Sequence, residues 1–459
     1  MDAHLGILGG GSSGLSLALL THLDHVIIEQ GDTAGGHATS TSIDGYVFDR
    51  GPHIMFSRNK LLLDCMVQSL GANVHQCKRN NVVSIAGGLA RYPIENDLAA
   101  LPLPLRSDAL ISLIEWQQRD DGAPGNLAEW FVANFGEVLT AAYFRPYNEK
   151  VWNVPLEKLS MVWADRIPRP PLADVVRGAM GELSEGYLHQ LYYSYPLRGG
   201  YTAFMDAWAA GVPSDRLQLG EEITAIVPVD AGVRVETGSR SWLFEQVVST
   251  LPIKYLVHLV PGVPSEVLDA VGRLVVNPML VITLGLLGED PNQYTAVYIA
   301  DDDFLVNRLS YPAVFSPHNA PAGHFSIQAE ITASPGAEVM TWDDDAVLNH
   351  VLNGLRERGL ISEGQKVTFQ IVERYDQAYV VYTQGYEPDI ELATAWFAER
   401  GIVVHGRFGA HEYLNVDGCL DRSIALARRL GADLSDDDVL AVFAALGAEH
   451  PDRTDVTSP

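Results

Sequence analysis

The stretch "HLGILGGGSSGLSLALL", residues 4–20, decides the fold of this chain. A short apolar run is followed by a glycine turn and then by the apolar pattern of a helix, which predicts a β-strand, a tight turn and an α-helix. Gly9, Gly11 and Gly14 match the GxGxxG spacing of dinucleotide-binding βαβ units. The first glycine allows the turn, the second lets a pyrophosphate approach the backbone, and the third lets the helix pack on the strand.

A second strand pattern, "HVIIE", strengthens this prediction. It ends at Glu29, and an acid at this distance from the first glycine binds a ribose hydroxyl in such units. The helix between the strands, with Ser13 in its first turn, would offer unpaired N–H groups to phosphates. A GxGxxG match alone is a weak signal, whereas these parts in this order make a strong one.

The next stretch, "GDTAGGHATS", distinguishes a flavin from a nicotinamide cofactor. Gly35 and Gly36, followed by His37, resemble the second glycine pair of FAD proteins of the glutathione-reductase and amine-oxidase type. The alternative is an ordinary glycine-rich surface loop. We therefore predict an α/β fold with FAD as cofactor: a Rossmann-like FAD-binding domain of the glutathione-reductase type, a helical insertion domain and an antiparallel β-sheet domain.

Helix and strand patterns along the chain predict the bounds of these parts. The FAD-binding domain is predicted to be discontinuous, and a β-sheet domain is expected to carry the substrate. The predicted segments are 1–76, 198–252 and 398–433 for the FAD-binding domain, 98–190 for the helical domain, 77–97 and 253–397 for the sheet domain, and 434–459 for a C-terminal helix and tail.

Composition excludes several classes of partner. The net charge of −27 over 459 residues would repel phosphate chains, so no nucleic-acid partner is expected. No apolar run is long enough to span a membrane, so we expect a cytoplasmic protein with no membrane partner. Cys65, Cys77 and Cys419 have neither the spacing of a metal site nor the even number of a disulfide framework. No metal is predicted.

Four further motifs carry a family resemblance. They are "YFRPYNEKVWNVPLEKLSMVWADRI" (143–167), "YPLRGGYTAF" (195–204), "VYIADDDFLVNRLSY" (297–311) and "HGRFGAHEY" (405–413). Together with the FAD fingerprint, they resemble the flavin-dependent UDP-galactopyranose mutases, and most of all the larger eukaryotic type. The resemblance extends from about residue 4 to residue 430.

This resemblance implies an isomerase that acts on a nucleoside-diphosphate sugar. Such a mutase interconverts pyranose and furanose forms without net redox change, and N5 of the reduced FAD attacks the anomeric carbon. The resemblance allows NAD(P)H as an external reductant and leaves a homo-oligomer open. The competing predictions are an FAD-dependent oxidase or desaturase of the amine-oxidase superfamily, and a flavin-containing binding protein without catalysis.

The resemblance also assigns residues. His53 would lie beside the flavin, and Arg166 with Arg308 would clamp the diphosphate. The hydroxyls of Tyr298, Tyr379 and Tyr413 would reach the same phosphates, while Tyr92, Tyr147, Asn148 and Trp152 would line the nucleotide site. The remaining flavin contacts would be Val227, Gly406, Arg407, Val416, Asp417 and Gly418.

The chain departs from the family pattern at three positions. Glu95 replaces a glutamine that binds uracil, and an ionised carboxylate can only accept hydrogen bonds. The base is therefore predicted not to be uracil, with guanine the first alternative, unless Glu95 lies on the surface and the backbone reads the base. Gln190 replaces an asparagine near the hexose, and Phe315 replaces a tyrosine, which suggests a different or smaller sugar.

Overall fold

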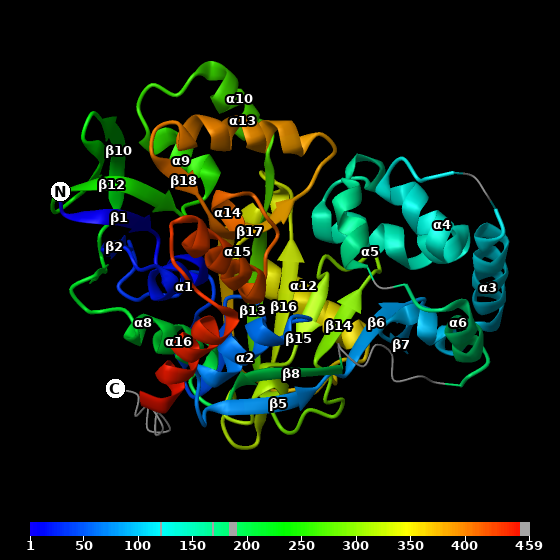
Figure 1. Cartoon of the computed structure of the whole chain (residues 1–459). Helices are drawn as coiled ribbons and strands as arrows, with labels where there is room; N and C mark the ends of the chain where they lie inside the picture. The colour runs from blue at the N-terminus through cyan, green and yellow to red at the C-terminus, as the bar shows by residue number, and fades with distance from the viewer. Residues whose placement is uncertain (120–121, 168, 183–190, 450–459) are drawn as a thin grey trace.

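The computed structural model describes residues 1–119, 122–167, 169–182 and 191–449 (Figure 1). The predicted strand, turn and helix are present as β1 (Ala3–Leu8) and α1 (Ser12–Leu20). β1 pairs in parallel with both β2 and β12, at the centre of a seven-stranded sheet. The order is β10-β11-β12-β1-β2-β9, with β18 beside β12, and the other strands are β2 (His25–Ile28), β9 (Leu217–Gln218), β10 (Ile223–Val229), β11 (Gly232–Thr237), β12 (Ser241–Ser249) and β18 (Ile402–Val404).

Helices from distant parts of the chain cover this sheet. Leu5 and Ile7 of β1 pack with helices from both ends of the chain, in a core that includes Trp208 and Phe443. The helices of this core are α1, α2 (Lys60–Gln68), α8 (Gly200–Ala210), α15 (Val416–Arg429) and α16 (Asp436–Glu449). A second core contains β1 residues and the helices α9 (Ile253–Leu259), α10 (Ser265–Arg273) and α13 (Tyr386–Ala398).

A second seven-stranded sheet runs in the order β17-β13-β16-β15-β14-β6-β7. Its strands are β6 (Asn81–Ile85), β7 (Gly88–Arg91), β13 (Val275–Leu287), β14 (Ala296–Ile299), β15 (Arg308–Ser310), β16 (His324–Thr332) and β17 (Val367–Val381). All its pairs are antiparallel except β6–β14, which is parallel. The predicted α/β FAD-binding fold is confirmed, but this sheet is mixed, because the β6–β7 hairpin joins it from an earlier part of the chain.

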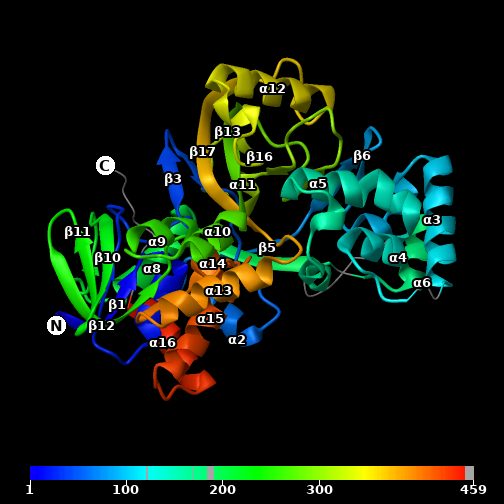
Figure 2. The same cartoon turned by 90° about the horizontal axis from the view of Figure 1, so that it is seen from above.

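The helical segment lies to one side of both sheets in both views (Figures 1 and 2). Its helices are α3 (Leu103–Gln117), α4 (Leu127–Leu139), α5 (Arg145–Trp152) and α6 (Leu172–Ala179), with a π-helical turn at Thr140–Phe144 and short 3-10 helices at Ile94–Asn96 and Met161–Arg166. Packed aromatic rings hold this segment together: the Phe144 ring stacks on Phe131 with centroids 4.8 Å apart, and its centroid lies 4.3 Å from that of the tilted Phe135 ring. The domain bounds given above stay a prediction.

Smaller elements connect these parts. The strand pairs β3–β4 and β5–β8 each form a separate two-stranded antiparallel sheet. The bounds of the remaining elements are β3 (Ser40–Ile43), β4 (Tyr46–Asp49), β5 (Val74–Lys78), β8 (Tyr192–Pro196), α11 (Pro312–Phe315), α12 (Asp344–Glu357) and α14 (Gly406–Gly409). The turn after β4 touches the second sheet, because Gln328 Nε2 donates to the Asp49 carbonyl at 2.7 Å. Within the described ranges, no helix is long and apolar enough to cross a membrane.

Candidate functional site

The glycine turn after β1 lies so close to neighbouring parts of the chain that side chains larger than glycine would clash there. Gly9 has φ +100°, and a Cβ there would lie 2.3 Å from the Thr250 hydroxyl oxygen. A Cβ on Gly14 would lie 2.0 Å from the Gly9 carbonyl oxygen, so only glycine lets the helix start this close to the strand. Gly11 precedes α1 and supplies no side-chain cap, which leaves the first N–H groups of the helix for a ligand.

Two more predicted residues adjoin this turn. Glu29 accepts hydrogen bonds from the backbone N–H groups of Gly10 at 2.6 Å and Gly31 at 2.8 Å, which fixes its carboxylate beside the turn. Gly36 has φ +58°, and a Cβ there would lie 3.2 Å from the Gly11 Cα. The second glycine pair therefore faces the first, as an FAD cradle requires.

The segment from Gly406 to the start of α15 completes the predicted FAD site. Gly406 has φ +79°, and a Cβ there would lie 2.5 Å from the Ser13 Oγ. The segment runs on into α15, whose N-cap Asn415 makes no side-chain cap hydrogen bond, so its first turn at Val416, Asp417 and Gly418 also has free N–H groups. The residues present therefore fit FAD. Val227 lies in β10, at the outer edge of the sheet, and His37 packs its ring against Phe408 at 5.3 Å.

His53 occupies the turn after β4. Burial and the nearby charges of Arg407, protonated His37 and Arg308 lower the pKa of His53 to about 3, so its imidazole is neutral at neutral pH. Its Nδ1 is buried and has no hydrogen-bond partner among the described residues. His53 can therefore exchange one hydrogen bond with a bound group without carrying charge.

The prediction missed Asp49, which holds this turn. Its buried carboxylate accepts hydrogen bonds from the Ser40 hydroxyl at 2.6 Å, the Tyr195 hydroxyl at 2.8 Å and the Tyr201 N–H at 3.2 Å. Burial raises its pKa to about 6, and these donors oppose the shift. The available signal was an acid at the end of a strand pattern, immediately before the turn that carries His53.

Arg308 has a partner that the prediction also missed. Glu330, which is fully buried, accepts from the Arg308 Nε at 2.8 Å and Nη2 at 2.7 Å across the β15–β16 pair. Nη2 also donates to the Tyr379 hydroxyl at 3.3 Å. Because Glu330 already accepts from Nε and Nη2 of Arg308, the guanidinium must bind any phosphate through the edge that carries Nη1.

Two other arginines converge on the same rings. The Tyr413 ring stacks on Tyr379 with centroids 5.8 Å apart. The guanidinium of Arg407 lies 4.2 Å from the Tyr413 ring, and that of Arg166 lies 5.0 Å from it. Arg166 is exposed and donates to the Tyr413 carbonyl, and among the described residues it forms no ion pair with a carboxylate. The structure thus brings Arg166, Arg308, Arg407, Tyr379 and Tyr413 together.

The predicted nucleotide residues form a ring cluster beside these arginines. The Tyr298 ring centroid lies 5.1 Å from that of Tyr92 and 5.7 Å from that of Tyr147. Trp152 stacks on Trp163 at 4.0 Å and also meets Tyr413 edge-on at 5.6 Å. Asn148 is used internally, since its amide donates to the Phe144 carbonyl at 2.7 Å and accepts from the Trp152 indole at 3.3 Å.

The three positions that depart from the family pattern have different surroundings. Glu95 is buried, so the alternative of a surface glutamate is wrong. Phe315 is a core residue whose ring lies 5.5 Å from that of Tyr195. Gln190 lies outside the described residues.

Both cations of the segment 144–152 are structural. Arg145 pairs with Glu149 and Glu157, each at 2.7 Å. Lys150 Nζ donates to three carbonyls: that of Ile299 at the end of β14, at 3.1 Å, and those of Asp301 and Phe304 in the loop that follows, the latter at 2.9 Å. Lys150 thus ties α5 to the loop that separates Tyr298 from Arg308.

Replacing Lys150 by methionine is expected to lower the free energy of unfolding by about 1–3 kcal/mol, because three carbonyls lose a charged donor. Urea denaturation of the holoprotein measures this change. The control is Lys158→Met, since Lys158 is exposed and its replacement should leave stability within about 0.5 kcal/mol. Equal effects of the two substitutions would contradict a structural role for Lys150.

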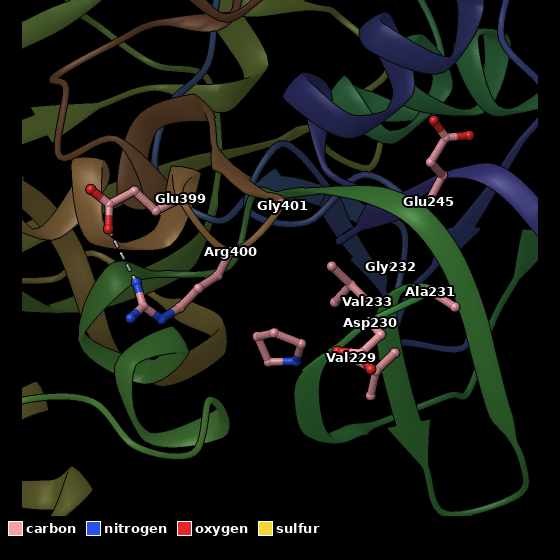
Figure 3. Close-up of a pocket in the computed structure, with 10 residues that line it drawn as sticks. Val229, Asp230, Ala231, Gly232, Val233, Glu245, Glu399, Arg400 and Gly401 are labelled. Carbon is pink, nitrogen blue, oxygen red and sulfur yellow. Dashed lines mark ion pairs between the residues drawn. The ribbon is translucent and has the colours of Figure 1, made fainter.

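A separate recess of about 600 Å³ lies at the β10–β11 turn (Figure 3). It is lined by residues 228–233, Glu245, Glu399, Arg400 and Gly401, and the Glu399–Arg400 ion pair at 3.5 Å stands at its side. None of the predicted site residues lines it. The glycine turns and the arginine cluster, rather than this recess, define the candidate site.

This cradle and its neighbouring arginines define a flavoenzyme with an α/β FAD-binding fold. The profile of the flavin containing amine oxidoreductases matches residues 13–430. The chain belongs to that family, and its cofactor is FAD.

Individual relatives differ in what they do. The chain is 20% identical to the coproporphyrinogen III oxidase of Bacillus subtilis (strain 168), over 92% of this chain and 96% of that protein. A crystal structure of reduced UDP-galactopyranose mutase aligns with a TM-score of 0.86 at 24% identity, over 97% of this chain and 99% of that one. Cyclohexylamine oxidase from Brevibacterium oxydans IH-35A aligns with a TM-score of 0.67 at 14% identity, over 94% and 100%. These structural similarities establish the fold.

Proposed function

We propose that the chain is a flavin-dependent mutase that interconverts the pyranose and furanose forms of a nucleoside-diphosphate sugar. The observation that carries this proposal is the convergence of Arg166, Arg308 and Arg407 on the stacked rings of Tyr379 and Tyr413. A chain with a net charge of −27 gathers cations in this way where it binds a small anion. An oxidase acting on an apolar amine would not need such a cluster.

The arginines have distinct tasks in this reaction. Bound FAD, when reduced, supplies a nucleophile at N5. Arg166 makes no ion pair within the part of the chain that the structure describes, so its charge is available to neutralise the diphosphate as this group leaves the anomeric carbon. Arg308, held rigid by Glu330, orients the diphosphate through its outer edge, and the Tyr379 hydroxyl lies within reach of the same group.

The remaining residues orient the substrate. The half-buried rings of Tyr92, Tyr147 and Tyr298 would hold the nucleoside, which fixes the sugar relative to the flavin. Neutral His53 would hold a hydrogen bond at the flavin side without adding charge. NAD(P)H would serve as the external reductant, and the base is proposed not to be uracil because of Glu95.

The test is turnover of nucleotide sugars by the dithionite-reduced holoenzyme, with pyranose and furanose products separated by chromatography. We expect interconversion by the reduced form and none by the oxidised form. Arg166→Ala should reduce turnover by about 10²-fold or more, because it removes transition-state charge stabilisation, while FAD content stays unchanged.

An oxidase would behave in the opposite way. It would consume O₂ with an amine or a porphyrinogen, and its reduced form would convert no nucleotide sugar of a panel of UDP-, GDP-, CDP- and dTDP-sugars. That result would reject the proposed mutase activity and support the oxidase alternative. The matched control variant is Arg177→Ala, since Arg177 is an exposed arginine of α6 that pairs with Asp174.

A further inference from the structure

We propose that Glu95 selects the nucleotide base by accepting two N–H groups from one edge of it, and that the base is therefore guanine. This inference rests on the proposed function, whose substrate it narrows to a guanosine-diphosphate sugar.

Glu95 is buried, three residues after Tyr92 of the ring cluster, rather than on the surface. It belongs to the 3-10 helix Ile94–Asn96, two residues after the peptide that joins Tyr92 to Pro93, and its side chain is 3% exposed. Burial raises the pKa of the Tyr143 hydroxyl well above its usual range, and four near groups raise it further: those of Tyr147, Tyr92, Tyr298 and Glu95. The short helix of Glu95 directly follows Tyr92, whose ring centroid lies 5.1 Å from that of Tyr298, so the carboxyl group is near the rings that would enclose a base.

The charged groups of neighbouring elements are engaged elsewhere. The Asp97 carboxylate accepts from the Arg91 N–H at 2.7 Å, and on α6 the Asp174 carboxylate pairs with Arg177 at 3.2 Å. Among the described residues, Glu95 makes no ion pair, and the one group that bonds its carboxyl is its own backbone N–H. Glu95 is thus a buried acid with unused acceptor capacity.

A second acceptor near Tyr298 is also unused. Asn81 donates its amide to the Tyr298 hydroxyl at 3.3 Å, whereas its Oδ1 is buried and has no hydrogen-bond partner among the described residues. A buried acceptor without a donor costs free energy, and a buried carboxylate costs more. The ring cluster therefore favours a ligand that brings N–H donors.

Guanine fits this requirement better than the other bases. Its N1–H and N2–H groups lie side by side on one edge and match the two oxygens of a carboxylate. In cytosine and adenine the amino group adjoins a ring nitrogen acceptor, and in uracil a single N–H stands between two carbonyls. An ionised Glu95 would repel those acceptors.

The protonation of Glu95 makes this selectivity dependent on pH. Burial raises the pKa of Glu95 to about 7, so the carboxyl group is largely protonated at pH 6 and largely ionised at pH 8. Two N–H donors require the ionised form, whereas a protonated carboxyl group donates once and accepts once, as uracil prefers. The preference for guanine should therefore grow as the pH rises through 7.

The experiment is calorimetric titration of the holoprotein with GDP and UDP at pH 6, 7 and 8. The ratio of the two dissociation constants is the readout, because ionisation of the diphosphate affects both ligands alike and cancels. We expect GDP to bind at least about tenfold more tightly than UDP at pH 8, and the ratio to fall toward one at pH 6.

Glu95→Gln is the decisive variant, since it keeps the shape of the side chain. It should abolish the preference for GDP and its pH dependence, with UDP binding improved. The matched control, Glu115→Gln on α3, changes an exposed acid of the same segment and should leave the ratio unchanged. FAD content and melting temperature report folding of both variants.

The outcomes separate this inference from the proposed function. A wild-type preference for UDP, or a GDP preference that survives Glu95→Gln, overturns the role of Glu95 even if the reduced enzyme is a mutase. Conversely, Glu95-dependent GDP binding without conversion of any nucleotide sugar supports the base assignment and rejects the mutase.

Discussion

Replacing Glu330 by alanine should lower the free energy of unfolding by about 3–5 kcal/mol, because it leaves the Arg308 guanidinium without its counter-charge. Glu330 is fully buried, and both of its oxygens accept from Arg308. The substitution also creates a cavity between β15 and β16. Denaturant unfolding of the holoprotein gives the change, and diphosphate affinity should fall as well because the guanidinium loses its fixed orientation.

A double variant distinguishes an unpaired charge from a lost carboxylate. Arg308→Met combined with Glu330→Leu removes both charges and fills the space, so it should recover much of the stability while diphosphate affinity stays low. Replacement of an entire buried ion pair by apolar side chains is often neutral, whereas removal of one partner is not. If the double variant were as unstable as Glu330→Ala, the pair would not explain the effect.

Substitution of Gly14 by alanine should abolish FAD binding. The added Cβ would lie 2.0 Å from the Gly9 carbonyl oxygen, which is backbone and cannot rotate away. The start of α1 would have to move relative to β1, and with it the N–H groups that face the pyrophosphate. The absorbance ratio of flavin to protein after purification measures the loss.

The control is Gly238→Ala, since Gly238 lies in the turn that joins β11 to β12 of the same sheet. A Cβ at Gly238 meets nothing within 4 Å, and its φ lies outside the left-handed region. This variant should retain full flavin content. Normal flavin content in Gly14→Ala would mean that the turn relaxes, and the fit of the cradle to FAD would have to be reconsidered.

The local parts of the fold were predictable because their signals are local. The spacing of Gly9, Gly11 and Gly14 describes one turn, and Glu29 follows it along the next strand, where the structure places it. The family resemblance allowed the prediction to include arginines and tyrosines that are far apart in the sequence.

The missed residues depend on pairing between strands. Glu330 is opposite Arg308 only because β15 and β16 pair in that register, and nothing in the strand pattern "HFSIQAEIT" distinguishes its acid from a solvent-facing one. The carbonyls bound by Lys150 likewise belong to a loop about 150 residues away. The parallel β6–β14 pair went unpredicted for the same reason, since register and direction arise from the assembled sheet.

The contact between Gly406 and Ser13 has a consequence for synthesis of the protein. These residues are almost 400 positions apart in the sequence, and a Cβ on Gly406 would lie 2.5 Å from the Ser13 Oγ. A ribosome must therefore release the chain at least as far as residue 406 before the flavin cradle can close. We therefore expect the completed flavin site to form only after residue 406 has emerged, and until then the first β-strand, turn and helix lack the partner that completes them.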